Sequence, residues 1–400
     1  MKLLSGCVAL GLLAGCCAAG EAQGAAGFAF RFTEAPGPYA VGLKVLPQYD
    51  RTRVFQAEGT GKAVKGPRPI QILVWYPAEA STTQRMTLGD YAELVKTETS
   101  FDQPVEHGKS QDFVAQYMHG TESQPRVAIR EAPGRAGHFP LVIYAPSVNA
   151  PAIENIELCE YLASWGYVVT ASPSLGTAGR EMTVDLGGAN AEARDISFLV
   201  DAAGTLPEAD VSEAAVIGYS WGGMGALFAA ARDKRVSALV SLDGSFRYSP
   251  GTVAEAGDVH PEAMTIPLLV FSRAEETLES WAAMQQEKDK SAPAPNVLNE
   301  WTHGDLVHVR MLAMSHIQFS SIFQRSERFR KQGVQFDPAD YSPEEGAESY
   351  NWVARYTLAF LNAYLKHDAD GVAFLKRIPA ENGVPRHLIA ASYRAAAAAK

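Results

Sequence analysis

The sequence contains little cysteine, and most of it lies at one end. Of the four cysteines in 400 residues, three fall within the first 17 positions, and Cys159 is the only one in the rest of the chain. A lone cysteine has no partner within the chain, so a disulfide scaffold is excluded in any compartment. Cys159 lies in an apolar helical pattern, and we expect a buried, unreactive thiol.

The sequence also lacks a surplus of basic residues, and it has no pattern of metal ligands. Lys and Arg number 35 against 45 Asp and Glu, which gives a formal net charge of −10, and no basic stripe offsets it. This balance argues against a nucleic-acid partner. No group of Cys and His has metal-ligand spacing, so we expect no metal and no other cofactor. Beyond the N-terminus, no apolar run is long enough to cross a membrane.

The N-terminus has the features of an export signal. A positive start at Lys2 precedes an apolar run of small residues, and the next charge is Glu21. The run is too short for a spanning helix, so residues 1–27 are predicted to be a signal peptide. Leu13-Ala14-Gly15-Cys16 resembles the signal of bacterial lipoproteins, in which the cysteine is lipidated. We therefore expect a protein of the bacterial cell envelope anchored through Cys16. The alternative is cleavage within 18–27, which would release a soluble periplasmic or secreted protein.

The rest of the chain changes from a β-rich extension to an alternating pattern. Residues 28–78 are rich in strand formers, and 79–137 are polar and irregular, with one short helix around 91–96. Short apolar strands then alternate with helices, which predicts a mostly parallel sheet with helices on both faces, an α/β fold. The expected strands are 141–144, 167–170, 214–218, 238–242, 266–272 and 306–312, and the expected helices are 153–165, 191–203, 222–231 and a last one around 353–364.

We expect one domain over 28–378 and a C-terminal tail over 379–400. Three segments interrupt the alternation, at 246–265, 275–304 and 322–349. Segments of this kind at the edge of an α/β sheet often build a substrate pocket, and the alternative is ordinary surface structure.

Gly218-Tyr219-Ser220-Trp221-Gly222 matches the pattern G-x-S-x-G. The string alone is weak, but it directly follows an apolar strand and opens a helix, as a nucleophile elbow must. Glycines allow the sharp turn, and the helix N-terminus favours developing negative charge beside the serine oxygen. Ser220 is therefore the predicted nucleophile. The alternative is a glycine-rich turn with a capping serine.

A nucleophilic serine needs a base and an orienting acid, which in this fold follow in the order Ser, Asp/Glu, His. Asp243 ends the strand at 238–242, and His316 follows the strand at 306–312, so both fit. Glu275 follows the next strand and is the alternative acid. The other histidines precede the serine, lie within a strand or irregular segment, or come in or after the last helix.

These motifs suggest a family. Gly218 to Gly223, Leu242-Asp243 and Ser315-His316-Ile317-Gln318-Phe319 resemble the bacterial dienelactone-hydrolase-like esterases of the α/β-hydrolase superfamily, in the branch related to platelet-activating-factor acetylhydrolase. Gly37 to Gly42 and Arg68 to Pro77 are similar too, so the resemblance runs discontinuously from about 37 to 366. In that branch the acid follows the strand that comes immediately after the nucleophile helix, and the resemblance therefore favours Asp243.

One motif departs from the family. Its members usually carry His-Gly-x-Gly after the first core strand, at the oxyanion hole, where this chain has Pro146-Ser147-Val148-Asn149. The hole uses backbone N–H groups, so a change of side chain does not remove its chemistry. The resemblance implies Val148 and Trp221 as the two donors.

The predicted function is hydrolysis of a carboxylic ester through Ser220, His316 and Asp243, with a small-molecule ester as substrate. A phospholipid or other lipid acyl hydrolase is the enzymatic alternative, which a membrane anchor would suit. A non-catalytic, membrane-tethered binding protein on the same scaffold is the alternative from a different class. The sequence gives no oligomeric state.

Lipidation at Cys16 is directly testable. In cells expressing the full chain, the wild type should incorporate labelled palmitate and Cys16→Ser should not, because the thiol is the acylated group. Cys17→Ser serves as the neighbouring control and should retain the label. Palmitate that persists in Cys16→Ser would contradict the anchor.

Overall fold

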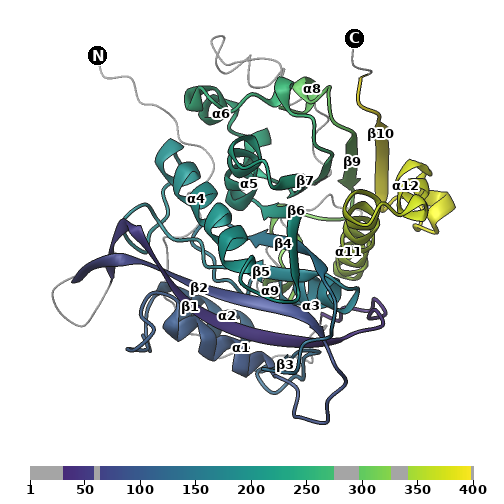
Figure 1. The fold of residues 1–400 in the computed structure, drawn as a ribbon. Coiled ribbons are helices and arrows are strands. Elements are labelled where there is room, and N and C mark those ends of the chain that lie inside the picture. The colour runs from purple at the N-terminus through teal and green to yellow at the C-terminus, as the bar shows by residue number, and fades with distance from the viewer. Residues whose placement is uncertain (1–29, 58–63, 274–296, 326–340, 398–400) are drawn as a thin grey trace.

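The computed structural model describes residues 30–57, 64–273, 297–325 and 341–397 (Figure 1). The predicted signal with Cys16 and the alternative acid Glu275 lie outside these ranges, so both stay predictions.

One ten-stranded mixed sheet, ordered β10-β9-β8-β7-β6-β4-β5-β2-β1-β3, forms the centre of the described chain. The six strands from β5 to β9 in this order are mutually parallel. Antiparallel pairs join β10 to β9, β5 to β2 and β2 to β1, and the short β3 pairs parallel with β1. This confirms the predicted α/β class with a β-rich extension. The strands are β1 Ala40–Ala57, β2 Val64–Ala78, β3 Ile129–Arg130, β4 Phe139–Ala145, β5 Val168–Ala171, β6 Ala209–Tyr219, β7 Val236–Leu242, β8 Leu268–Arg273, β9 Leu306–Met311 and β10 Ile389–Arg394.

Helices cover both faces of the sheet (Figure 1). Residues of β4 alternate between two apolar clusters, because successive side chains of a strand point to opposite faces. Leu141 and Ile143 join the cluster that includes α4 and α5, and Val142 joins the one that includes α3 and α11. The helices are α1 Leu88–Leu94, α2 Lys109–Met118, α3 Ile156–Ser164, α4 Leu186–Ala203, α5 Trp221–Arg232, α6 Pro250–Ala256, α8 Val297–Glu300, α9 Ser321–Arg325, α11 Pro343–Leu365 and α12 Ala369–Lys376, with 3-10 turns at Val95–Thr97, Ser245–Arg247, Pro261–Ala263, His316–Phe319 and Pro379–Asn382.

The long β1–β2 hairpin is tied to the α/β body by a buried arginine. Arg68 on β2 has no exposed surface and donates from Nε to Asp195 of α4 at 2.9 Å. Its remaining donors reach the carbonyls of Leu175, at 2.9 Å, and Gly176, at 2.5 Å. A buried guanidinium is tolerated only when its donors are paired in this way. The extension is therefore packed against the domain rather than appended to it.

The structure corrects two sequence expectations. Residues 79–137 are more ordered than predicted, since α2 follows α1 and buries Val114, Tyr117 and Met118 at helical spacing. Residues 379–400 were expected to form a tail, but β10 pairs antiparallel with β9 from Ile389 to Arg394. The sequence of β10 is Ile-Ala-Ala-Ser-Tyr-Arg, too polar and alanine-rich to signal a strand by itself, and its pairing with β9 explains why it forms.

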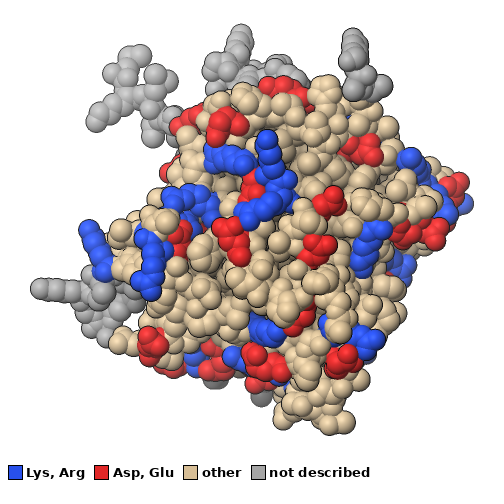
Figure 2. All heavy atoms as spheres, viewed as in Figure 1, with Lys and Arg blue, Asp and Glu red and all other residues tan. Residues whose placement is uncertain are grey.

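Acidic and basic side chains are interspersed over α4 and α5 on the face drawn in Figure 2. Ion pairs join Arg232 to Asp258 at 2.7 Å and Arg235 to Asp201 at 2.6 Å. Exposed pairs of this kind contribute little to stability. Among the residues that the structure describes, no helix is long and apolar enough to span a membrane.

The buried Glu192 of α4 makes stability depend on pH. Burial and the charge of Asp195 together raise the pKa of Glu192 to about 8, against the opposing effect of a hydrogen bond from Ser174. The folded state therefore keeps a proton that the unfolded chain, with an ordinary pKa of 4.5, has released. Because the folded state binds more protons in this window, this group makes the free energy of unfolding fall as pH rises from about 4.5 to 8.

Replacing Glu192 by its neutral isostere should remove this dependence. Glu192→Gln should gain stability relative to the wild type as pH rises from 5 to 8, by at most about 1.4 kcal/mol per pH unit. Denaturant unfolding at several pH values measures the difference. Glu255→Gln makes the same substitution at an exposed position and should give a curve parallel to that of the wild type. A parallel curve for Glu192→Gln would contradict the argument.

Candidate active site

The carboxyl ends of three parallel strands bring the predicted catalytic side chains together. Ser220 follows β6, Asp243 follows β7, and His316 lies five residues after β9 ends. His316 Nε2 lies 2.9 Å from Ser220 Oγ, and His316 Nδ1 lies 2.6 Å from Asp243 Oδ2. The three side chains thus form a continuous chain of two hydrogen bonds, in the order that the sequence predicts.

Ser220 sits on a sharp turn between β6 and α5. Its backbone has φ 52° and ψ −118°, a region that residues other than glycine rarely adopt. A Cβ on Gly218 would lie 2.4 Å from the carbonyl oxygen of Gly222, and one on Gly222 would lie 2.2 Å from that of Ala145. Only glycine fits at these two positions, which explains the flanks of the motif. The turn matches the predicted nucleophile elbow.

Asp243 is fully buried and surrounded by donors. Tyr248 donates its hydroxyl to Asp243 Oδ1, Arg247 Nη1 lies 3.3 Å from the same oxygen, and Arg273 Nε lies 3.7 Å from Oδ2. Burial alone would raise the pKa of Asp243, but the hydrogen bond and charge of His316, with Arg273 and Arg247, hold it well below its usual range. The carboxylate therefore stays charged at any pH at which the protein would work, and can orient the imidazole.

His316 is fixed from behind by Tyr219. The Tyr219 hydroxyl donates to the backbone carbonyl of His316 at 2.9 Å, and the two rings lie 5.4 Å apart. Ser220 and His316 are half-buried, whereas Asp243 and Tyr219 are buried, so the serine end of the hydrogen-bond chain is open to solvent.

Four residues around the site were not found from the sequence. Tyr219 occupies a variable position of the motif, and Arg247, Tyr248 and Arg273 belong to no motif. For Arg247 and Tyr248 the available signal is their closeness to Asp243 in sequence. For Arg273 it is its position at the end of β8.

The loop after β4, residues 146–149, contains a residue in the left-handed conformation although the expected glycines are absent. Asn149 stands at the second glycine position of His-Gly-x-Gly and has φ 60°, a conformation that asparagine tolerates better than most residues. Ser147 N–H donates to Glu154, and Ala150 N–H donates to the Ser147 carbonyl. Among the described residues no bond engages the Val148 N–H, and its role as an oxyanion donor stays a prediction.

Trp221, the other predicted donor, begins α5, so its N–H is one of the four that a helix leaves without an intrahelical partner. Its indole ring is buried in the core. A role for Trp221 at the oxyanion therefore rests on its backbone alone.

The rival residues are placed elsewhere or lie outside the described ranges. His308 is within β9, where Nε2 bonds Ser272 Oγ at 2.9 Å, and burial lowers the pKa of His308 to about 3. Cys159 is a buried free thiol in α3, and burial raises its pKa well above the usual value, as expected for an unreactive cysteine. Of the two candidate acids, Asp243 contacts His316, and Glu275 lies outside the described residues.

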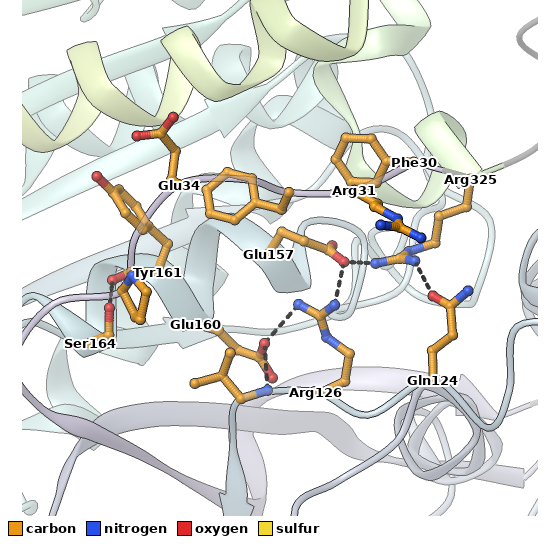
Figure 3. Close-up of a pocket in the computed structure, with 13 residues that line it drawn as sticks. Phe30, Arg31, Glu34, Gln124, Arg126, Glu157, Glu160, Tyr161, Ser164 and Arg325 are labelled. Atoms are coloured by element: carbon orange, nitrogen blue, oxygen red, sulfur yellow. Dashed lines mark hydrogen bonds and ion pairs between the residues drawn. The ribbon is translucent and has the colours of Figure 1, made fainter. Parts of the chain in front are cut away.

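A cavity of about 400 Å³ lies apart from the hydrogen-bonded chain and shares no residue with it (Figure 3). Within it, Arg126 bridges Glu157 at 2.9 Å and Glu160 at 2.8 Å, and Arg325 contacts Glu157 and Gln124. These opposite charges pair with one another. Ser220 and His316, the predicted nucleophile and base, do not line this cavity. Across the described residues, no group of three or more His, Cys, Asp or Glu side chains could hold a metal ion.

Neither a family model nor a curated protein matches this sequence. The fold, in contrast, matches 642 solved chains. A ferulic acid esterase from Streptomyces cinnamoneus superposes with a TM-score of 0.61 at 20% identity, over 84% of this chain and 93% of that chain. The chain therefore has the α/β-hydrolase fold. A fold shared so widely does not by itself define a reaction.

Substitution of each candidate acid tests the assignment. Asp243→Asn should lower kcat for an ester substrate by about 10³–10⁴-fold, because an amide no longer holds the imidazole in the required tautomer. Glu275→Gln should leave kcat within about threefold of the wild type, since Asp243 already occupies Nδ1 of His316. Steady-state kinetics on both purified variants measures this. A larger loss in Glu275→Gln than in Asp243→Asn would reverse the assignment.

Proposed function

We propose that the protein is a serine hydrolase that cleaves carboxylic esters through an acyl-enzyme intermediate on Ser220. The observation that carries this proposal is the chain of hydrogen bonds from Ser220 Oγ through His316 to Asp243, at 2.9 and 2.6 Å. The fold and the name of its structural neighbour, a ferulic acid esterase, support the same reaction class.

In the proposed first step, Ser220 Oγ attacks the ester carbonyl carbon while its proton passes to His316 Nε2. Asp243 stabilises the imidazolium through Nδ1. The carbonyl oxygen takes up the electron pair, and the N–H groups of Val148 and Trp221 stabilise the negative charge. Collapse of this intermediate breaks the bond to the alcohol oxygen, which receives the proton from His316 and leaves.

In the second step, water attacks the acylated serine. His316 takes the proton from the water, and the second oxyanion forms in the same place. When it collapses, the bond to Ser220 Oγ breaks, the serine recovers its proton, and the carboxylic acid leaves. Every proton is moved by His316, so the cycle needs neither a metal nor another cofactor.

The substrate is proposed to be a small ester or a lipid ester. Anchoring of the chain to the bacterial envelope through Cys16 is part of the same proposal and would place the site beside acyl lipids. A ferulic acid ester, short p-nitrophenyl esters and a phospholipid form a panel that separates a general esterase from a lipid acyl hydrolase.

Removal of the nucleophile tests the reaction. Ser220→Ala should lower kcat/KM by about 10³-fold or more on whichever ester the wild type cleaves, because the acyl-enzyme can no longer form. A fluorophosphonate probe should label the wild type stoichiometrically and leave Ser220→Ala unlabelled. Ser237→Ala on β7 is the control and should behave like the wild type. Full activity in Ser220→Ala would refute the proposal, and an unreactive serine in the wild type would favour a binding protein.

A further inference from the structure

Two fully buried polar residues, Glu154 and Asn155, lie between the two loops that meet at Ser220. They directly precede α3 and have no exposed surface. Neither belongs to the hydrogen-bonded chain of Ser220, His316 and Asp243. Buried polar groups are costly unless they are fully bonded, so their partners show what they hold in place.

The side chain of Glu154 holds the loop that carries Val148. Oε2 accepts the N–H of Ser147 at 2.8 Å and the hydroxyl of Tyr144 at 2.9 Å, and Oε1 bonds the hydroxyl of Ser147. Ser147 directly precedes the proposed oxyanion donor. The position of the Val148 N–H therefore depends on the length of the Glu154 side chain.

The other end of the loop is held separately. Glu98 accepts the N–H of Ala152 at 3.0 Å, and Arg180 donates to the carbonyl of Asn149 at 2.9 Å. Met182 N–H donates to the side chain of Asn149 at 2.7 Å. Side chains from distant segments thus fix a loop in which the glycines of the resembling family are absent.

The backbone of Glu154 and the side chain of Asn155 reach the segment after His316. The Glu154 carbonyl accepts Ser320 Oγ at 3.2 Å and Ile322 N–H at 3.3 Å. Asn155 Nδ2 donates to the Phe319 carbonyl at 3.0 Å and to Tyr144. Its Oδ1 accepts the N–H of Ser321 at 2.7 Å. The same pair of residues therefore contacts the oxyanion loop on one side and the histidine loop on the other.

We propose that Glu154 is a positioning residue for the proposed hydrolysis: its side chain sets the distance between the Val148 N–H and Ser220, while its backbone and Asn155 hold the loop of His316. This inference rests on the proposed function. In the resembling family the His-Gly-x-Gly segment lines the oxyanion hole. Here the side chain of Glu154 would hold the corresponding loop in position.

The hydrogen bond to Ser147 depends on the length of the Glu154 side chain and not on its charge. Burial raises the pKa of Glu154 to about 7, with the hydrogen bonds of Ser147 and Tyr144 and the charge of His316 opposing the shift. Near neutral pH the side chain is thus divided between its charged and neutral forms. Both forms keep a carbonyl-type oxygen that can accept the Ser147 N–H, so the contact persists in either.

Two substitutions separate reach from charge. Glu154→Asp keeps the charge but is one methylene shorter, so it should release Ser147 and lower kcat by about 10–100-fold with KM changed less than about threefold, because an oxyanion donor acts in the transition state. Glu154→Gln loses the charge but keeps the reach, so its kcat should stay within about fivefold of the wild type. A residue that acted only through its charge on His316 would give the opposite order.

Glu160→Asp is the matched control. Glu160 is also buried, lies on α3 and holds a loop by accepting the N–H groups of Val127 and Ala128 at 3.2 Å, but it does not contact the site. It should lose stability, measured by thermal unfolding, without the loss in kcat. An equal loss of kcat in Glu160→Asp, a wild-type kcat in Glu154→Asp, or a Glu154→Gln variant as impaired as Glu154→Asp would overturn the proposal.

The rate of fluorophosphonate labelling, measured in the same variants, gives a second readout that needs no substrate. It should fall in Glu154→Asp and hold in Glu154→Gln. If Glu154→Asp does not fold, Tyr144→Phe removes the second bond to the carboxylate oxygen that holds the Ser147 N–H and should also lower kcat, and an unchanged kcat there would overturn the proposal. A wild type that neither cleaves esters nor takes the probe refutes the proposed function itself. An active wild type with an equally active Glu154→Asp refutes only the role of Glu154.

Discussion

The site depends on a contact between two backbones. Gly222, at the start of α5, lies so close to the end of β4 that a Cβ would come within 2.2 Å of the Ala145 carbonyl and 2.4 Å of the Pro146 carbonyl. This closeness sets the Ser220 turn against the loop of Val148. Any side chain at position 222 would push the two apart. The Ser220 turn and the start of the loop after β4 thus form one packed unit, which is consistent with the unusual backbone at Ser220.

Buried polar groups hold the segments around this unit. Arg68 fastens the β1–β2 hairpin to α4 through Asp195, Glu154 fastens the loop after β4, and Asp243 is fixed by Tyr248 and two arginines. In a low dielectric such networks are strong when complete and costly when one member is lost. The loops of the site are therefore held by specific hydrogen bonds as well as by apolar packing. That arrangement suits side chains that must keep their distances while partly open to water.

The sequence was sufficient for the parts that follow local rules. Alternating apolar strands and helices predict the sheet, and G-x-S-x-G between a strand and a helix predicts the turn at Ser220. Asp243 and His316 follow from chain order and strand ends. Tyr219, Arg247, Tyr248 and Glu154 do not, because their contacts join segments far apart in the chain, or depend on the local path of a loop, and leave no periodic pattern. The strand at 389–394 could not be predicted for a related reason, because it forms through its pairing with β9 and its composition does not indicate a strand.

That last strand forms the edge of the sheet next to β9. β10 occupies the backbone groups of β9 along one side, and the Tyr393 hydroxyl and Ala396 N–H both bond Asp305, which directly precedes β9. An uncovered edge strand is a template for pairing with another chain. Trimming the chain before Ile389 would leave β9, largely apolar and close to His316, open along its length. The C-terminal strand thus puts a short, more polar strand at the edge in place of β9, and a chain that ended before Ile389 would offer β9 for pairing with another chain.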